Sequence, residues 1–255
     1  MITVYSNTIS VTTDAPLFDA DYQAVLNYAT TQGYALPSAG QQTLQNQLVV
    51  DLKAGGIWSK LDTFAVFATD GDSDFALIDW KRLTDYTAVN SPTFTADEGF
   101  TGNGTSSYVD CNYNGLTNGV NYANDSAHQM VWAMVFGASI ELATNNLSQP
   151  RQSIRRSTSG NNGINSTTAA AGTSNSAVGF IMFSRYNSTN YNQYNNNSLL
   201  GNVSQPRNST GGTSLVLRTN LGYSNSTIAA ASLGADLSSE ASSYYTALNT
   251  YISAL

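Results

Sequence analysis

The chain has 255 residues, a net charge of −7 and a pI near 4.4, and only 11% of its residues are charged. Proteins that bind nucleic acids cluster Lys and Arg to neutralise phosphates, and this acidic chain has few basic residues. The composition therefore disfavours nucleic-acid binding. A single cysteine and a single histidine exclude a disulfide framework and a multi-histidine zinc site within one chain. Asparagine is about as frequent as all charged residues together, which indicates a neutral surface suited to an assembly or to sugars.

The first segment, from Met1 to about Thr13, alternates apolar and polar residues and predicts one or two β-strands. It has no local partner, so we expect it to join the main sheet or to pair with a neighbouring chain. The segment lacks the charged and apolar regions of a signal peptide, which predicts synthesis in a host cytoplasm without a secretion signal. No apolar run is long enough to cross a bilayer.

A helical hairpin is predicted next. Asp19 is the expected N-cap of the first helix and Gly33 its expected end, and Pro37 and Ser38 start a second helix that stops at Gly55. Apolar residues recur at helical spacing in both segments. The two stripes comprise Tyr22, Val25, Leu26 and Ala29, then Leu44, Leu48, Val49 and Leu52.

From Leu61 onward the period of the apolar residues changes from 3.6 to two. Short β-rich runs alternate with Gly, Asn and Ser clusters, and the first of them predicts a strand, the turn "DGDSD" and a returning strand. We therefore predict a mainly β fold with two packed antiparallel sheets between Leu61 and about Ser232. The chain then ends in a helix capped by Ser238 or Ser239, with an apolar stripe formed by Ala241, Tyr244, Leu248, Tyr251 or Ile252, and Leu255.

The stretch "FTADEGFTGNGTSSYVDCNYN" places three glycines before an alternating run. A phosphate-binding loop would lead into a helix and carry a Lys nearby, whereas these glycines lead into a strand. Gly99, Gly102 and Gly104 therefore predict a tight link between strands. The side chains expected to enter the sandwich core from this stretch are Phe94, Phe100, Tyr108 and Val109.

The part "GFTGNGTSSYVDCNYN" resembles the "GF-x-G-x-G-x-x-x-Y-V/I" strand of laminin-G and concanavalin A-like jelly rolls, and more narrowly such domains in bacteriophage virion proteins. The stretches "LDTFAVFATDGDSDFALIDWK", "VWAMVFGA" and "ASLGADLSSEASSYYTALNTYISAL" agree in kind and order, so the resemblance covers roughly Leu61 to Leu255. It implies a concanavalin A-like jelly-roll β-sandwich over residues 61–255, preceded by a strand and helical adaptor over residues 1–60.

The resemblance also implies a non-enzymatic virion structural protein, projecting from the virion surface as a spike, head fibre or tail appendage and able to meet host glycans. Its expected partners are other virion proteins and copies of itself, with a homotrimer favoured; no nucleic acid, membrane or cofactor is expected. Two alternatives stay open, because this sandwich serves many functions. One is a polysaccharide depolymerase, and the other is a capsid decoration or joint protein without host contact.

The sequence offers one weak candidate metal site. Asp70, Asp72 and Asp74 alternate as at the start of a calcium loop, but the twelfth position holds Lys81 where such a loop requires a bidentate Glu. A hairpin turn with solvated carboxylates is the favoured interpretation, and Ca²⁺ binding is the alternative.

No catalytic residues are predicted. Glycoside hydrolysis requires two carboxylates across a cleft, yet Asp97 and Glu98 are adjacent and would point to opposite faces of a strand. Glu141 stands alone and Glu240 belongs to the terminal helix. The chain also lacks a Gly-x-Ser-x-Gly nucleophile elbow.

The segment "SRYNSTNYNQYNNNS" is the candidate for sugar contact, since tyrosine rings stack on pyranose faces and asparagine bonds to hydroxyls. The candidate residues are Tyr186, Tyr191, Tyr194, Asn192 and Asn195. An edge hairpin that packs against a neighbouring subunit is the equally weighted alternative. The predicted core residues outside this segment include Trp58, Trp80, Trp132 and Cys111.

Overall fold

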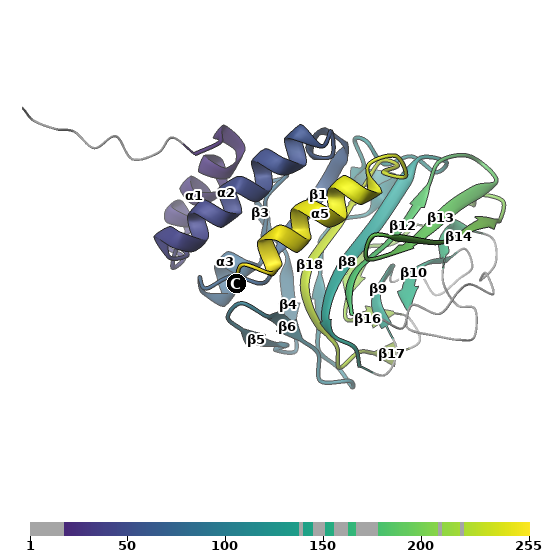
Figure 1. Ribbon diagram of the computed structural model, residues 1–255. Coiled ribbons are helices and arrows are strands. Elements are labelled where there is room, and N and C mark those ends of the chain that lie inside the picture. The colour runs from purple at the N-terminus through teal and green to yellow at the C-terminus, as the bar shows by residue number, and fades with distance from the viewer. Residues whose placement is uncertain are drawn as a thin grey trace, which may run out of the picture.

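The chain folds into three layers, shown in Figure 1 as a computed structural model that describes residues 18–137, 140–144, 151–155, 163–166, 178–208, 211–219 and 222–255. A layer of helices covers one face of an eight-stranded sheet, and a six-stranded sheet packs on its other face. This confirms the predicted mainly β sandwich with an N-terminal helical region and a C-terminal helix. The predicted strand at Met1 to Thr13 lies outside the described residues.

Both large sheets are antiparallel. The larger has the order β14-β13-β12-β8-β18-β6-β5, with β1 also paired to β18. Its strands are β1 (Leu61–Val66), β5 (Thr93–Thr95), β6 (Gly99–Thr101), β8 (Ala127–Val135), β12 (Gly179–Arg185), β13 (Asn190–Asn195), β14 (Ser198–Ser204) and β18 (Thr227–Gly234).

The smaller sheet has the order β11-β10-β9-β15-β7-β4. Its strands are β4 (Thr87–Val89), β7 (Tyr108–Asp110), β9 (Ile140–Thr144), β10 (Arg151–Arg155), β11 (Gly163–Ser166) and β15 (Ser214–Val216). Two short hairpins complete the described strands: β2 (Ile78–Asp79) with β3 (Thr84–Asp85), and β16 (Arg218–Thr219) with β17 (Gly222–Tyr223).

The helix layer consists of α1 (Ala20–Gln32), α2 (Ala39–Ala54) and α5 (Ala241–Ile252). The carboxylate of Asp19 accepts a hydrogen bond from a backbone N–H at the start of α1, and the Ser38 hydroxyl does the same for α2. Gly33 ends α1 in the left-handed conformation, as predicted. The remaining helical pieces are η1 (Trp58–Lys60), α3 (Ser73–Ala76) and α4 (Gly115–Asn118).

The start of α5 differs from the prediction that Ser238 or Ser239 caps it. Glu240 occupies the N-cap position and makes no side-chain capping bond. Ser238 instead bonds within the preceding turn. Both its N–H and its hydroxyl donate to the Asp236 carboxylate, at 2.9 and 2.6 Å. The serine thus closes the turn between β18 and α5.

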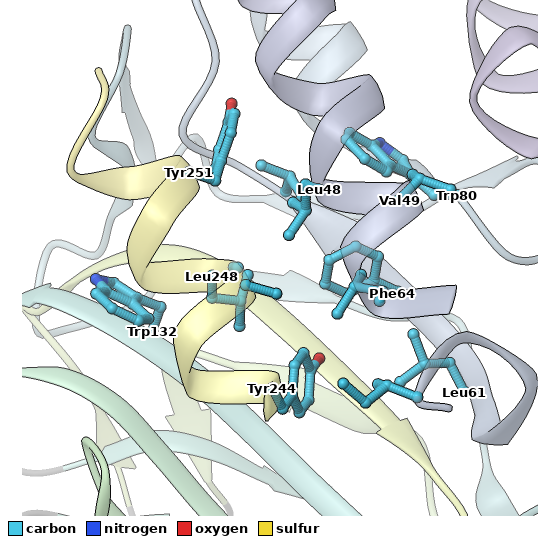
Figure 2. Packing of buried hydrophobic residues seen from close by; sticks show 14 of the residues in the cluster. Leu48, Val49, Leu61, Phe64, Trp80, Trp132, Tyr244, Leu248 and Tyr251 are labelled. Atoms are coloured by element: carbon cyan, nitrogen blue, oxygen red, sulfur yellow. The ribbon is translucent and has the colours of Figure 1, made fainter. Parts of the chain in front are cut away.

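Period-two alternation in the larger sheet separates two cores. In β8, Met130 and Trp132 face the helices, whereas Val131 and Ala133 face the smaller sheet. We call these the helix-side core and the inter-sheet core. Figure 2 shows the helix-side core, where Tyr244, Leu248 and Tyr251 of α5 meet residues of α2, β1 and β8. The predicted core residues Trp58, Trp80, Trp132 and Cys111 are all buried.

The glycine-rich stretch forms the predicted link between strands. Gly99 has a φ of 103°, and a Cβ there would overlap the carbonyl oxygen of Ile228 in β18. Gly102 has an ordinary φ, but a Cβ on it would overlap the carbonyl oxygen of Ser224. Both positions therefore require glycine because two backbones approach closely. The same stretch buries Phe100 and Val109 in the inter-sheet core.

The predicted turn at "DGDSD" is wrong, because the chain forms the single-turn helix α3 there. The chain then comes back beside β1, where the N–H of Trp80 donates to the carbonyl of Phe64 at 2.8 Å, but β2 forms its ladder with β3. The cause of the helix is Asp72, whose carboxylate accepts from the N–H of Phe75 at 2.7 Å and so caps a helix in place of a turn. Among the described residues, no helix has the length and apolar character needed to cross a membrane.

Candidate functional site

The Asn/Tyr-rich segment is a regular part of the larger sheet. It contributes β13, which pairs with β12 on one side and with the last strand, β14, on the other. These strands lie at the end of the sheet away from α1 and α2 (Figure 1). The segment therefore belongs to the hairpin β13–β14 at the edge of the larger sheet.

Alternation along β13 divides the five predicted sugar-contact residues. Tyr191 is fully buried in the inter-sheet core, where its ring packs against Phe183 and below the guanidinium of Arg185. Asn195 is only 9% exposed and donates to the carbonyl of Phe180. Neither of these two side chains can meet a sugar in this fold, and both leave the candidate site.

The other three candidates come together on the opposite face with two further asparagines. Tyr186, directly after β12, is 38% exposed, and Asn192 is half-buried. Tyr194 is 9% exposed and its ring packs in the helix-side core, so it contributes its hydroxyl and not its ring. Cross-strand pairing places Asn202 of β14 directly opposite Asn192. We call the group the Asn/Tyr surface; its members are Tyr186, Asn190, Asn192, Tyr194 and Asn202.

Hydrogen bonds connect all five members. Asn202 donates from Nδ2 to the Tyr186 hydroxyl and, at 2.8 Å, to Oδ1 of Asn192. Asn190 donates to Oδ1 of Asn202 at 3.0 Å, and Asn192 donates to the Tyr194 hydroxyl at 3.0 Å. Each amide still has an unused N–H or lone pair, since an asparagine side chain offers two N–H donors and a carbonyl oxygen with two lone pairs. The network therefore orients its groups before any ligand arrives.

Tyr194 fixes one end of the network to the protein. Its hydroxyl donates to the carbonyl of Ser238 at 3.0 Å. Burial raises the pKa of Tyr194, so the hydroxyl keeps its proton for this bond. The neighbouring Asp236 carboxylate is occupied, because it accepts from Ser184 at 2.6 Å as well as from Ser238.

The sequence pointed to part of this site only. Asn190, Asn192 and Tyr194 share one face of a strand by simple parity, so period two could have selected them and rejected Tyr191 and Asn195. Asn202 gave no such signal, because its place opposite Asn192 depends on the register of the β13–β14 hairpin.

Two of the three predicted metal ligands, Asp70 and Asp72, accept hydrogen bonds from backbone N–H groups. Asp70 accepts from the N–H of Ser38 at 2.9 Å, and the second oxygen of Asp72 accepts from the N–H of Ala35 at 2.8 Å. Both carboxylates thus hold the connection between α1 and α2 against the sandwich, while Asp74 lies exposed in α3. In the described part of the chain, no three His, Cys, Asp or Glu side chains gather around a metal-sized space.

The acids considered for catalysis do not form a pair. Asp97 accepts from Gln41 at 2.6 Å, while its neighbour Glu98 is exposed. Glu240 forms an ion pair with Lys60 at 2.8 Å. The side chain of Glu141 lies outside the described residues. Catalysis by two carboxylates therefore has no support at these positions.

A groove of about 440 Å³ separates α2 from α5. Its lining is small and polar, with Ala54, Gly55, Ser242 and Ser243 among the residues, and Asp51 is its ionisable group. The small side chains let the two helices approach each other. The groove does not hold the grouping of aromatic and amide side chains found on the Asn/Tyr surface.

No family model and no curated protein matches the chain. Among solved structures, the chain is similar to domain 4 of AbnA, a GH43 extracellular arabinanase from Geobacillus stearothermophilus, solved in complex with arabinotriose. The identity is 12% and the TM-score 0.47, over 73% of this chain and 98% of that one.

Proposed function

We propose that the protein is a non-enzymatic carbohydrate-recognition module that contacts neutral glycans through the Asn/Tyr surface. The observation that carries the proposal is the hydrogen-bonded row from Tyr186 through Asn202 and Asn192 to Tyr194 on one face of β12–β14. Amide groups match the paired donors and acceptors of sugar hydroxyls, and an exposed tyrosine ring matches the apolar face of a pyranose.

Preorganisation supports the same function. Side chains that already hold one another in place lose less conformational entropy when a ligand binds than side chains that the ligand must order. The five residues of the surface are uncharged, so a neutral sugar needs to displace no counter-ion. A catalytic role receives less support, because the Asp236 carboxylate near Tyr194 already accepts three hydrogen bonds at Oδ1 from Ser184 and Ser238.

The test is binding of the full chain to a panel of immobilised neutral oligosaccharides, followed by titration of the best one. Asn202→Ala removes the amide that joins Tyr186 to Asn192, and Tyr186→Ala removes the exposed ring; each should weaken binding at least tenfold. Asn197→Ala is the matched control, because Asn197 is exposed in the turn of the same hairpin and outside the network. It should bind as the unaltered chain does.

Two outcomes would overturn this proposal. Unchanged binding by both Asn202→Ala and Tyr186→Ala would move glycan contact away from the Asn/Tyr surface. Release of new reducing ends from a polysaccharide, abolished by Asp236→Asn, would establish the depolymerase alternative instead.

We further propose that the module acts on a phage particle, as a projecting homotrimeric spike, head fibre or tail appendage. Support comes from the sequence resemblance over Leu61 to Leu255 and from the low charge, which leaves neutral surfaces that can be buried without desolvating ions. Imaging the particle with a labelled chain, and measuring the mass of the purified protein, test this setting. A monomer whose Asn/Tyr surface packs against another virion protein would favour the purely structural alternative.

A further inference from the structure

A second cluster of aromatic and charged side chains lies on the other sheet. In β7, Tyr108 and Asp110 share the face opposite to the buried Val109. Arg218 and Tyr223 are directly opposite each other in the β16–β17 hairpin, so they share a face as well. The two faces meet, because the Arg218 guanidinium lies over both tyrosine rings.

The guanidinium contacts both tyrosine rings, which are neighbours of each other. The guanidinium carbon lies 4.4 Å from the centroid of the Tyr108 ring and 5.1 Å from that of Tyr223. The two ring centroids are 6.2 Å apart, with planes inclined by 43°. Attraction between cation and ring faces of this kind fixes the guanidinium without using its N–H groups.

Those N–H groups distinguish Arg218 from the other arginines whose side chains the structure describes. Arg82 donates to Asp79 and to two backbone carbonyls, Arg185 donates to three carbonyls, and Arg207 lies 3.8 Å from Asp125. Arg218, by contrast, makes its described contacts through the two rings alone and is half-buried. Its five donors are positioned but unused, a fork that matches the two oxygens of a carboxylate.

Asp110 adds an acceptor beside the fork. One carboxylate oxygen accepts from the N–H of Asn112 at 2.8 Å, and Asp110 shares a face of β7 with Tyr108, whose ring contacts Arg218. A carboxylate in this position accepts hydrogen bonds from ligand hydroxyls. It also repels ligands that bring several negative charges, as does the net charge of −7.

We propose that Tyr108, Arg218 and Tyr223 form a binding site for the carboxylate of an acidic sugar, with Asp110 accepting from a hydroxyl of the same ring. A uronic acid unit combines one carboxylate with neighbouring hydroxyls, which is the pattern these residues complement. An acidic peptide has the carboxylate but carries amides in place of the hydroxyls and clusters its charges near Asp110. The site stands independently of the Asn/Tyr surface, which lies on the other sheet.

The experiment is calorimetric titration of the full chain at low salt with an aldobiouronic acid, which joins one uronic acid unit to one neutral sugar and so carries one carboxylate, and with its methyl ester as the neutral counterpart. The acid should bind at least tenfold more tightly than the ester. Arg218→Gln should reduce the affinity for the acid to that for the ester, and Arg218→Lys should recover only part of it, because an ammonium lacks the planar fork. Arg207→Gln, another half-exposed arginine, should leave the affinity unchanged.

Equal binding of acid and ester, or full affinity in Arg218→Gln, would overturn the proposal. An acidic peptide that binds as tightly as the aldobiouronic acid, with the same dependence on Arg218, would replace the sugar by a peptide and overturn the proposal too. Melting curves and circular dichroism of each variant show whether the fold is intact; if Arg218→Gln does not fold, Tyr223→Leu removes one ring and should give the same loss. A parallel titration of Tyr186→Ala keeps this outcome separate from that of the Asn/Tyr surface.

Discussion

His128 is the one histidine of the chain, and it lies buried in β8 on the face that meets the helices. Its Nδ1 lies 2.6 Å from the carbonyl oxygen of Ala235, so Nδ1 must carry the proton and donate. Its Nε2 then accepts from the Ser232 hydroxyl at 3.0 Å, which in turn accepts from the Tyr244 hydroxyl at 2.8 Å. This chain of bonds requires the neutral imidazole, because a second proton on Nε2 would face the hydroxyl that donates to it.

Stability should therefore fall in mild acid. Burial lowers the pKa of His128 from 6.5 to about 4, against smaller opposing effects from the Ala235 carbonyl and from Asp62 and Asp236. Between these two values the unfolded chain binds a proton that the native state does not, so the free energy of unfolding decreases as the pH falls. The full loss is about 3 kcal/mol, since one pKa unit corresponds to about 1.4 kcal/mol.

Urea unfolding of the unaltered chain and of His128→Gln, at several pH values from 7 to 4, measures this effect. Carboxylates titrate in both proteins and cancel in the comparison. The stability difference between the two should shrink steadily below pH 6.5, and parallel curves over that range would contradict the assignment.

At the scale of elements, Asp70 and Asp72 join the helix layer to the sandwich through backbone bonds. Asp72 both caps α3 and accepts from the N–H of Ala35, and Asp70 accepts from Ser38 at the start of α2. Two of the three alternating acids, Asp70 and Asp72, thus serve a structural purpose.

Asp72→Ala should destabilise the protein by about 1–2 kcal/mol, because it removes a helix cap and one further acceptor. In a chain of this length that corresponds to a decrease of roughly 2–8 °C in melting temperature. Asp74→Ala is the control, since Asp74 is exposed in the first turn of α3, and it should cost only a few tenths of a kcal/mol. EDTA should leave the melting temperature of every variant unchanged; a loss of several degrees that Ca²⁺ restores would show that these acids do hold a metal.

The elements also show which parts of the fold can be predicted from patterns among neighbouring residues. The change of period at Leu61 and the caps Asp19 and Ser38 are properties of neighbouring residues, and each predicted its element. Parity along β13 is just as local, but it was not applied, so the predicted sugar-contact residues came from both faces of the strand. The features that the sequence predicted wrongly or did not predict depend on residues that are far apart in the sequence. The Tyr108–Arg218 contact joins residues that are far apart in sequence, and it needs Leu217 at a φ of 67° to turn the chain between β15 and β16. No sequence pattern predicts that a residue other than glycine adopts this conformation.

At the scale of the whole molecule, the larger sheet contributes to two cores at once, so its strands β1, β8, β12, β13 and β18 depend on both neighbouring layers. Leu248 of α5 is fully buried in the helix-side core, and Leu233 of β18 is fully buried in the inter-sheet core. The helix-side core also includes residues from both sides of residue 60, for example Leu48 and Phe64, as Figure 2 shows. We therefore expect the predicted adaptor and sandwich to unfold together, even though the sequence divides them at residue 60.

The chain carries its own reporters for this prediction. All three tryptophans lie in the helix-side core, whereas Cys111, whose thiol pKa is raised by burial, lies in the inter-sheet core. Tryptophan fluorescence and labelling of Cys111 by a brief pulse of thiol reagent should give the same urea midpoint, as a two-state transition requires. Leu248→Ala and Leu233→Ala, each costing about 2–5 kcal/mol, should shift both midpoints together. If Leu248→Ala moved the fluorescence midpoint and left the labelling midpoint in place, the helix layer would be a separate unit docked on an independently stable sandwich.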